Sequence, residues 1–318
     1  MSPSAPARTV SMQRWALAAA LAIMVVWGVN FSVTKYLLDV IGVGPFLFMR
    51  FIIMPALGLA LLLAVYRRQI ARSWPRREDW PRFVAAGLIG HTAHVSIVTW
   101  GINFSTAFSS ALVLTSGPLF TLLILAALGA ERLRPRQVAG TLVAFAGIVL
   151  FLSDKFAAGL SRAGAGDLVL LFAASLFSVY IVIIKPLVAR YGPLQVTCYT
   201  LFVGAPPIAL ATLPSFAALP LAGLPLGVWP AMFWAAVVSA FLGWLVWTWV
   251  NAVRGIARSA PLQYLMPPIA GLAAWLTLGE TFTWLKIAGA GVTLAGIAWA
   301  QFGGGHAPPR EAAQPDSG

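Results

Sequence analysis

The chain has 318 residues, of which 60% are hydrophobic and only 9% are charged, and its mean hydropathy is +0.86. Soluble globular proteins have about 25% charged residues, so this composition argues against a water-soluble protein. The formal net charge is +12, from 21 basic and 9 acidic residues. A basic chain can bind nucleic acid, but the positions of these charges indicate a membrane topology instead, and no nucleic-acid partner is expected.

Ten apolar runs follow one another along the chain, each close to the roughly 20 residues that a helix needs to cross a bilayer. They predict an all-α polytopic membrane protein with ten transmembrane helices, and they leave no room for a separate soluble domain. A cytoplasmic tail at 1–14 precedes them, and a disordered cytoplasmic tail at 303–318 follows. The runs cover residues 15–41, 44–66, 82–104, 106–128, 136–153, 166–187, 194–213, 228–250, 259–279 and 284–302.

The first run follows Arg8 and Arg14, as the apolar core of a signal peptide would. It is longer than the core of about 7–15 residues that such peptides have, and nine further runs come after it. We therefore expect a retained first helix. Cys198 is the only cysteine, so no internal disulfide can form.

The basic residues are unequally divided between the two sides of the predicted topology. With a cytoplasmic N-terminus, sixteen fall on the cytoplasmic side and four, Lys35, Lys155, Arg162 and Lys286, on the opposite side. This is the positive-inside bias. It predicts a bacterial-type cytoplasmic (inner) membrane protein with both termini in the cytoplasm, and anionic membrane lipids as a minor partner.

Two segments of the chain share one pattern. ERLRPRQVAGTLVAFAGI begins at Glu131, and ETFTWLKIAGAGVTLAGI begins at Glu280, 149 residues later. Trp100 and Pro118 match Trp249 and Pro267 at the same offset. Nearer the start the register drifts, because Lys35 pairs with Lys185 at an offset of 150 and Gly44-Pro45 with Gly192-Pro193 at 148.

Equivalent segments lie five predicted helices apart, an odd number, so they face opposite sides of the membrane. This explains why the first copy has three arginines in its opening six residues and the second has no basic residue there. We predict two inverted five-helix repeats at 15–153 and 166–302, joined by an external linker at 154–165. The alternative is chance self-alignment of sequence rich in Ala, Gly and Leu.

Inverted repeats are typical of secondary transporters, in which two halves rock around a central site. The sequence has no phosphate loop of the form G-x-x-x-x-G-K-[ST], and no cofactor is expected. An enzyme is not expected, because Asp39, Asp154 and Asp167 fall at helix ends and no H-E-x-x-H cluster occurs. A channel or a non-transporting membrane scaffold is the alternative.

Four motifs resemble the drug/metabolite transporter superfamily and, within it, the EamA family. They are WGVNF, FLFMRF, SGPLFTLLILAALGAERL and YLMPPIAGLAAWLTLGETF, in the first, second, fourth and ninth runs. The resemblance covers about residues 15–302 and implies a cavity lined mainly by the first, third, fourth, sixth, eighth and ninth helices. The fifth and tenth helices would then pack at the periphery. The family includes amino-acid exporters and drug exporters, so the resemblance leaves the substrate open.

Polar side chains inside a membrane are candidates for function. His91 and His94 are three residues apart and share a helix face, so they are candidates for proton coupling or for binding a carboxylate. Asn30 could bind a substrate's ammonium or carboxylate group. The alternative for all three is a hydrogen bond between helices.

Tyr180, Gln263 and Tyr264 could complete a polar and aromatic lining. Trp100, Trp244 and Trp247 could offer flat faces to an aromatic or cationic solute, although many tryptophans form interfacial belts. Pro118, Pro267 and Pro268 are predicted to interrupt their helices. They could be hinges for a conformational change, or static kinks filled by neighbouring helices.

Five charged residues receive a structural interpretation. Arg50 lies about 9 Å inside the second run, at 1.5 Å per residue. That helix is not an expected cavity wall, so an ion pair or snorkelling is favoured over binding of an anion. Lys35 and Lys185 are expected to snorkel, and Glu131 and Glu280 to lie at helix N-termini.

Together these observations predict a secondary transporter that exports small organic solutes, with neutral or aromatic amino acids as the first expectation. The partners are a small-molecule substrate, membrane lipids and, through the histidines, protons. A monomer is the expected state.

Overall fold

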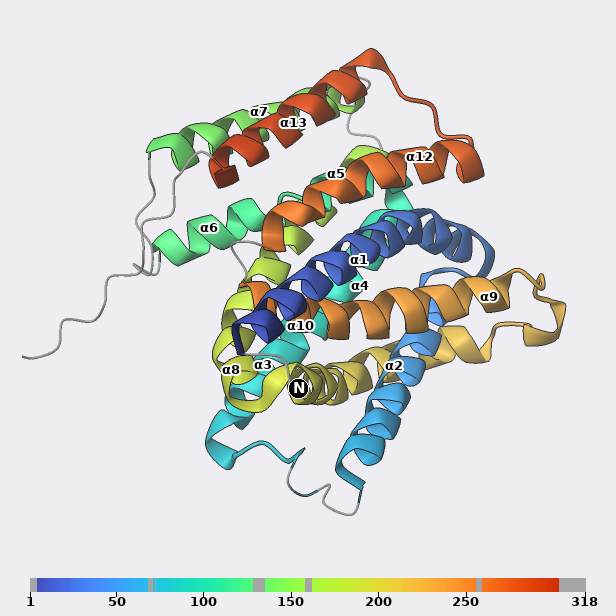
Figure 1. Cartoon of the computed structure of the whole chain (residues 1–318). Helices are drawn as coiled ribbons and strands as arrows, with labels where there is room; N and C mark the ends of the chain where they lie inside the picture. The colour runs from blue at the N-terminus through green and yellow to red at the C-terminus, as the bar shows by residue number, and fades with distance from the viewer. Residues whose placement is uncertain are drawn as a thin grey trace, which may run out of the picture.

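The computed structural model describes residues 5–67, 71, 73–127, 135–157, 162–255 and 259–302. Within these ranges the regular structure is entirely helical, without a strand (Figure 1). The helices follow the apolar runs because a continuous apolar segment cannot leave backbone polar groups unpaired in lipid, and a helix pairs them within itself.

The chain opens with two long helices, α1 (Ala5–Ile41) and α2 (Val43–Tyr66). Gly42 joins them with φ 78° and ψ 172°, a backbone conformation that residues with a Cβ rarely adopt. Gly44, which the sequence comparison paired with Gly192, lies inside α2. The backbone equivalent of Gly192 (φ 79°, ψ 166°) is therefore Gly42.

The third predicted run is one continuous helical stretch with a π-helical insert. It consists of η2 (Arg77–Asp79), α3 (Trp80–Ala86), the π segment η3 (Gly87–Ala93) and α4 (His94–Phe104). The fourth run is not one helix as predicted. It divides into α5 (Ala107–Leu114) and α6 (Gly117–Ala127) around a turn at Thr115 and Ser116.

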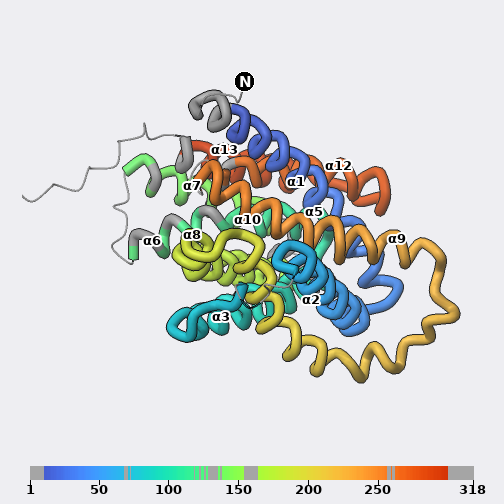
Figure 2. The backbone as a smooth tube through the Cα atoms, turned by 60° about the horizontal axis from the view of Figure 1, so that its bottom comes forward, coloured from blue at the N-terminus to red at the C-terminus, as the bar shows by residue number. Residues whose placement is uncertain are grey.

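Helix α7 (Pro135–Ala157) completes the first half, and α8 (Arg162–Ala217) opens the second. Non-helical backbone at Gly192 divides α8 into two parts that correspond to the sixth and seventh runs. In Figure 2 the second part of α8 runs past α2 and returns through the connection at 218–227. That connection contains η4 (Leu221–Gly223).

The eighth run again contains a π segment, since η5 (Trp234–Leu242) joins α9 (Val228–Phe233) to α10 (Gly243–Arg254). The ninth run is divided between the 3-10 segment η6 (Ala260–Leu265) and α12 (Met266–Leu278). The last helix is α13 (Trp284–Phe302).

The three prolines that were predicted to interrupt their helices lie instead at the beginning of helices. Pro267 and Pro268 occupy the first turn of α12, and Pro118 is the second residue of α6. The first turn tolerates proline because its N–H groups have no partner within the helix. The expectation of proline inside a continuous helix was therefore wrong, and the interruption lies just before each proline.

Five helical stretches are long and apolar enough to cross a membrane by length and composition. Four further apolar helices in the described parts of the chain are shorter. The five stretches are Ser11–Ile41, Val43–Tyr66, Arg77–Phe104, Gly164–Ala217 and Val228–Arg254.

Helices α7 and α13 lie side by side at one edge of the molecule, as expected for the fifth and tenth runs (Figure 1). Glycines allow their backbones to touch. A Cβ on Gly147 would lie 2.3 Å from the backbone nitrogen of Thr293, and one on Gly296 would lie 2.3 Å from that of Ala144. The main hydrophobic core lies away from this pair, around α1, α2 and α8, and includes Leu37, Phe46 and Leu201.

Candidate functional site

A cavity at the centre of the bundle is lined by both halves of the chain. It contains about 140 Å³ of space that water-sized molecules could occupy, and it is partly open to the surroundings. Its walls come from α1, α2, α4 and α5 in the first half, and from α8, η5, α10, η6 and α12 in the second. These are the helices that the family resemblance implied, with α2 in addition.

Four of the nine predicted substrate-binding residues line this cavity: Asn30, His94, Trp244 and Gln263. In α1, the Asn30 Nδ2 donates a hydrogen bond to the Thr34 hydroxyl at 3.2 Å. The Asn30 Oδ1 is buried and has no hydrogen-bond partner. An unpaired buried carbonyl oxygen is costly unless a ligand or water satisfies it, so Asn30 offers the cavity an acceptor.

The histidines differ in their surroundings. The His94 Nδ1 lies 2.9 Å from the carbonyl oxygen of Ala173, which can only accept. The Nδ1 is therefore the protonated nitrogen, and in the neutral ring the Nε2 is left as an acceptor. His91 is fully buried, its Nε2 lies 3.1 Å from the Thr200 hydroxyl, and it is not part of the lining.

Trp244 lies between the cavity and the side chains of His91 and Tyr180. Its ring is 4.5 Å from that of His91 and 5.3 Å from that of Tyr180, between centroids. Tyr180 is buried against Gly90, where a Cβ would lie 2.1 Å from its ring. Tyr180 and His91 thus support the aromatic wall from outside the cavity.

The other predicted aromatic residues lie outside the lining. Trp247 is buried and packs on Trp27 at 5.6 Å. Trp100 is 47% exposed on the outer surface, as an interfacial anchor would be. Tyr264, next to Gln263, does not reach the cavity.

Sequence reasoning missed Trp27 and misplaced Arg50, which both line the cavity. The Trp27 Nε1 donates to the carbonyl oxygen of Ser239 at 2.9 Å, joining α1 to η5. Arg50 enters from α2, which was not an expected wall. Among the described residues, no ion pair accounts for Arg50. The available signal was depth, since Arg50 lies about six residues inside an apolar run, as Lys35 also does.

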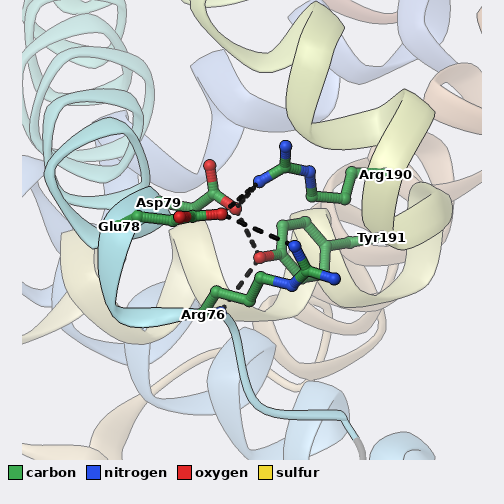
Figure 3. A network of polar contacts seen from close by, with 5 residues as sticks. All are labelled: Arg76, Glu78, Asp79, Arg190 and Tyr191. Atoms are coloured by element: carbon green, nitrogen blue, oxygen red, sulfur yellow. Dashed lines mark hydrogen bonds and ion pairs between the residues drawn. The ribbon is translucent and has the colours of Figure 1, made fainter.

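A polar cluster ties the start of the third stretch to the bend in α8 (Figure 3). Arg190 contacts Asp79 at 2.7 Å and Glu78 at 2.9 Å, and the Tyr191 hydroxyl donates to Asp79 at 2.5 Å. The backbone N–H of Arg76 donates to the Tyr191 oxygen at 3.0 Å. Arg190 and Tyr191 directly precede Gly192, so the cluster holds α8 where its backbone bends.

A second set of contacts lies at the other end of the third helical stretch, where α4 ends. The Lys35 Nζ donates to the carbonyl oxygen of Asn103 at 2.9 Å and lies 3.9 Å from Asp39. Glu280 accepts from the backbone N–H of Ala107 at 2.7 Å, so it caps α5 and not the helix that follows it in sequence. Glu131, its predicted counterpart, lies outside the described residues. Lys185 is exposed.

Apolar helices that surround a partly polar cavity define an integral membrane protein. The EamA-like transporter family matches residues 14–153 and 164–301, nearly the whole chain. The chain belongs to this family. Its two matched segments correspond closely to the predicted repeats.

Some curated relatives with similar sequences are named as exporters or efflux pumps. A probable terminal-alkyne amino-acid exporter of Streptantibioticus cattleyicolor is 29% identical, over 89% of this chain and 91% of the relative. A probable amino-acid metabolite efflux pump of Salmonella typhimurium is 26% identical, over 87% and 92%. A solved crystal structure matches with a TM-score of 0.62 at 21% identity, covering 91% of this chain and 98% of that one. This last likeness shows the fold.

Proposed function

We propose that the protein is a secondary transporter that exports amino acids or related small organic solutes by alternating access. The observation that carries the proposal is the cavity lined by both halves, with the acceptors Asn30 and His94 beside Trp27 and Trp244. The relatives named as amino-acid exporters support the direction and the class of solute. The proposed location is a bacterial-type cytoplasmic membrane.

The proposed mechanism requires two halves with equivalent, inverted structures, and matching irregularities support that arrangement. The π segments Gly87–Ala93 and Trp234–Leu242 overlap when the first is shifted by 149 residues. The turn at Thr115 and Ser116 falls on the end of η6 at the same shift. Gly42 and Gly192 share one backbone conformation at a shift of 150. Irregularities at common positions favour a repeat over chance similarity of apolar sequence.

The α7–α13 contact has the symmetry that a pseudo-two-fold axis would produce. At an offset of 149, Gly147 corresponds to Gly296, and Ala144 corresponds to Thr293. The contact of Gly147 with Thr293 is thus the equivalent of the contact of Gly296 with Ala144. We propose ten transmembrane helices, with these two at the periphery and the other eight forming the moving parts.

Counterflow tests this function directly. Purified protein is placed in liposomes loaded with unlabelled amino acids, and labelled amino acids are added outside, with and without a proton gradient. Saturable accumulation without a gradient is the expected result. Folded protein that shows no accumulation with any amino acid would contradict the proposal. Flux that does not saturate as the solute concentration rises would indicate a channel.

A further inference from the structure

Arg50 is a cation inside the bundle without a counter-ion. Within the described parts of the chain it has neither an ion pair nor a hydrogen bond, and its Nε is buried without a partner. Among the described residues, the ring of buried Phe46 contacts it, with the ring centroid 5.8 Å from the guanidinium carbon. A charge at this depth is expensive and marks a functional site unless it is neutralised.

The carboxylates whose side chains the structure describes are all engaged elsewhere. Asp39 lies near Lys35, and Asp79 contacts Arg190 together with Glu78. Asp167 accepts from the Ser105 hydroxyl. Glu280 caps α5. None of the described side chains therefore supplies a carboxylate to the guanidinium, and a solute in the cavity could supply one.

We propose that Arg50 binds the carboxylate of the transported solute, and that the cavity therefore selects carboxylate-bearing solutes over amines. This inference rests on the proposed transport function and names its substrate class. The planar guanidinium can bind a carboxylate through two parallel hydrogen bonds. Phe46 supports it through a cation–π contact on the ring face.

The remaining polar groups of the cavity complement an amino acid. The Asn30 Oδ1 and the neutral His94 Nε2 can accept hydrogen bonds, as an ammonium group requires. Trp27 and Trp244 provide apolar wall for a side chain. A zwitterion thus finds a cation for its carboxylate and acceptors for its ammonium, whereas an amine would leave Arg50 unpaired.

Competition in counterflow tests the inference on the wild-type protein. L-leucine and L-phenylalanine are compared with their amides and with isoamylamine and phenethylamine, which lack the carboxylate. We expect the amides and amines to compete about 10- to 100-fold more weakly, as loss of a hydrogen-bonded charge pair would produce. Equal competition by acids and amines would overturn the role of Arg50 while leaving transport intact. Folded wild-type protein that exchanges no amino acid would overturn both proposals.

Variants then assign the selectivity to one residue. Arg50→Gln should weaken leucine binding about 10- to 100-fold and leave competition by isoamylamine unchanged, and Arg50→Lys should fall between it and the wild type. The matched control, Lys185→Gln, removes an exposed cation outside the cavity. It should change neither leucine binding nor competition by isoamylamine. A folded Arg50→Gln protein with wild-type discrimination would overturn the inference. Should Arg50→Gln fail to fold, the wild-type comparison and Arg50→Lys decide.

Discussion

At the scale of single residues, hydrogen bonds separate two histidines that the sequence presents as a pair. His94 is held by the carbonyl of Ala173 and lines the cavity, whereas His91 bonds to Thr200 behind Trp244. Their spacing of three predicts one shared face, and both contact Trp244. The spacing could not predict which of them meets the cavity, because that depends on packing against α8. We therefore assign solute contact, and any proton exchange with the solute, to His94.

Two substitutions distinguish these roles. His94→Leu should raise the half-saturation concentration for leucine about tenfold, because an acceptor for the solute is lost. His91→Leu should leave the half-saturation concentration unchanged and lower the free energy of unfolding by about 1 kcal/mol, the cost of one buried hydrogen bond. Concentration-dependent counterflow and thermal melting in detergent measure the two effects. The reverse pattern would place the solute at His91.

At the scale of helices, the sequence predicts where each helix lies but not where the backbone inside it departs from α-helical geometry. Runs of apolar residues locate each helix, since burial of apolar surface and internal pairing of the backbone both favour it. The π segments and the turn at Thr115 and Ser116 lie inside runs that are mostly apolar. Hydropathy locates each run as a whole and does not locate these interruptions within it.

The α7–α13 contact provides a prediction at this scale. Gly296→Ala should destabilise the protein by roughly 1–3 kcal/mol, because the added Cβ would meet the backbone of Ala144 in a packed contact. Gly291→Ala is the matched control on the same helix, since no atom lies within 4 Å of its Cβ position. Thermal melting of the two variants checks this. Equal melting temperatures would show that the close contact contributes nothing.

The cluster in Figure 3, which joins η2 to the bend in α8, provides a second prediction: we propose that it acts as a gate between these two elements. Asp79→Asn removes the ion pair of a buried carboxylate with Arg190. We expect a larger population with the two elements apart, because this contact no longer favours closure. Spin labels at Arg77 and Ala189, which are both exposed, would then show a longer label-to-label distance by pulsed electron paramagnetic resonance. An unchanged distribution, matching that of Lys185→Gln, would contradict a gating role.

At the scale of the whole molecule, the sequence predicted a helical membrane protein, and the family resemblance implied most of the helices around the cavity. The sequence favoured an ion pair or snorkelling for Arg50, because the second helix was not an expected cavity wall. Depth inside an apolar run marks Arg50 as unusual, but the direction in which its side chain faces depends on how α2 packs against its neighbours. The proposed repeat is supported in sequence by the glycines that both segments have at the α7–α13 contact.

The most direct test of the central claim is the accessibility of the cavity from each side of the membrane. Val98→Cys places a thiol in the lining, in a Cys198→Ser background that removes the only native cysteine. Leu112→Cys, at a fully buried core position, is the control and should not react. We predict that a membrane-impermeant thiol reagent labels Val98→Cys in both right-side-out and inside-out vesicles, that transported amino acid slows both reactions, and that the vesicles stay tight to small ions. Labelling from one side only under every condition, or labelling from both sides with an ion leak, would contradict alternating access through this cavity.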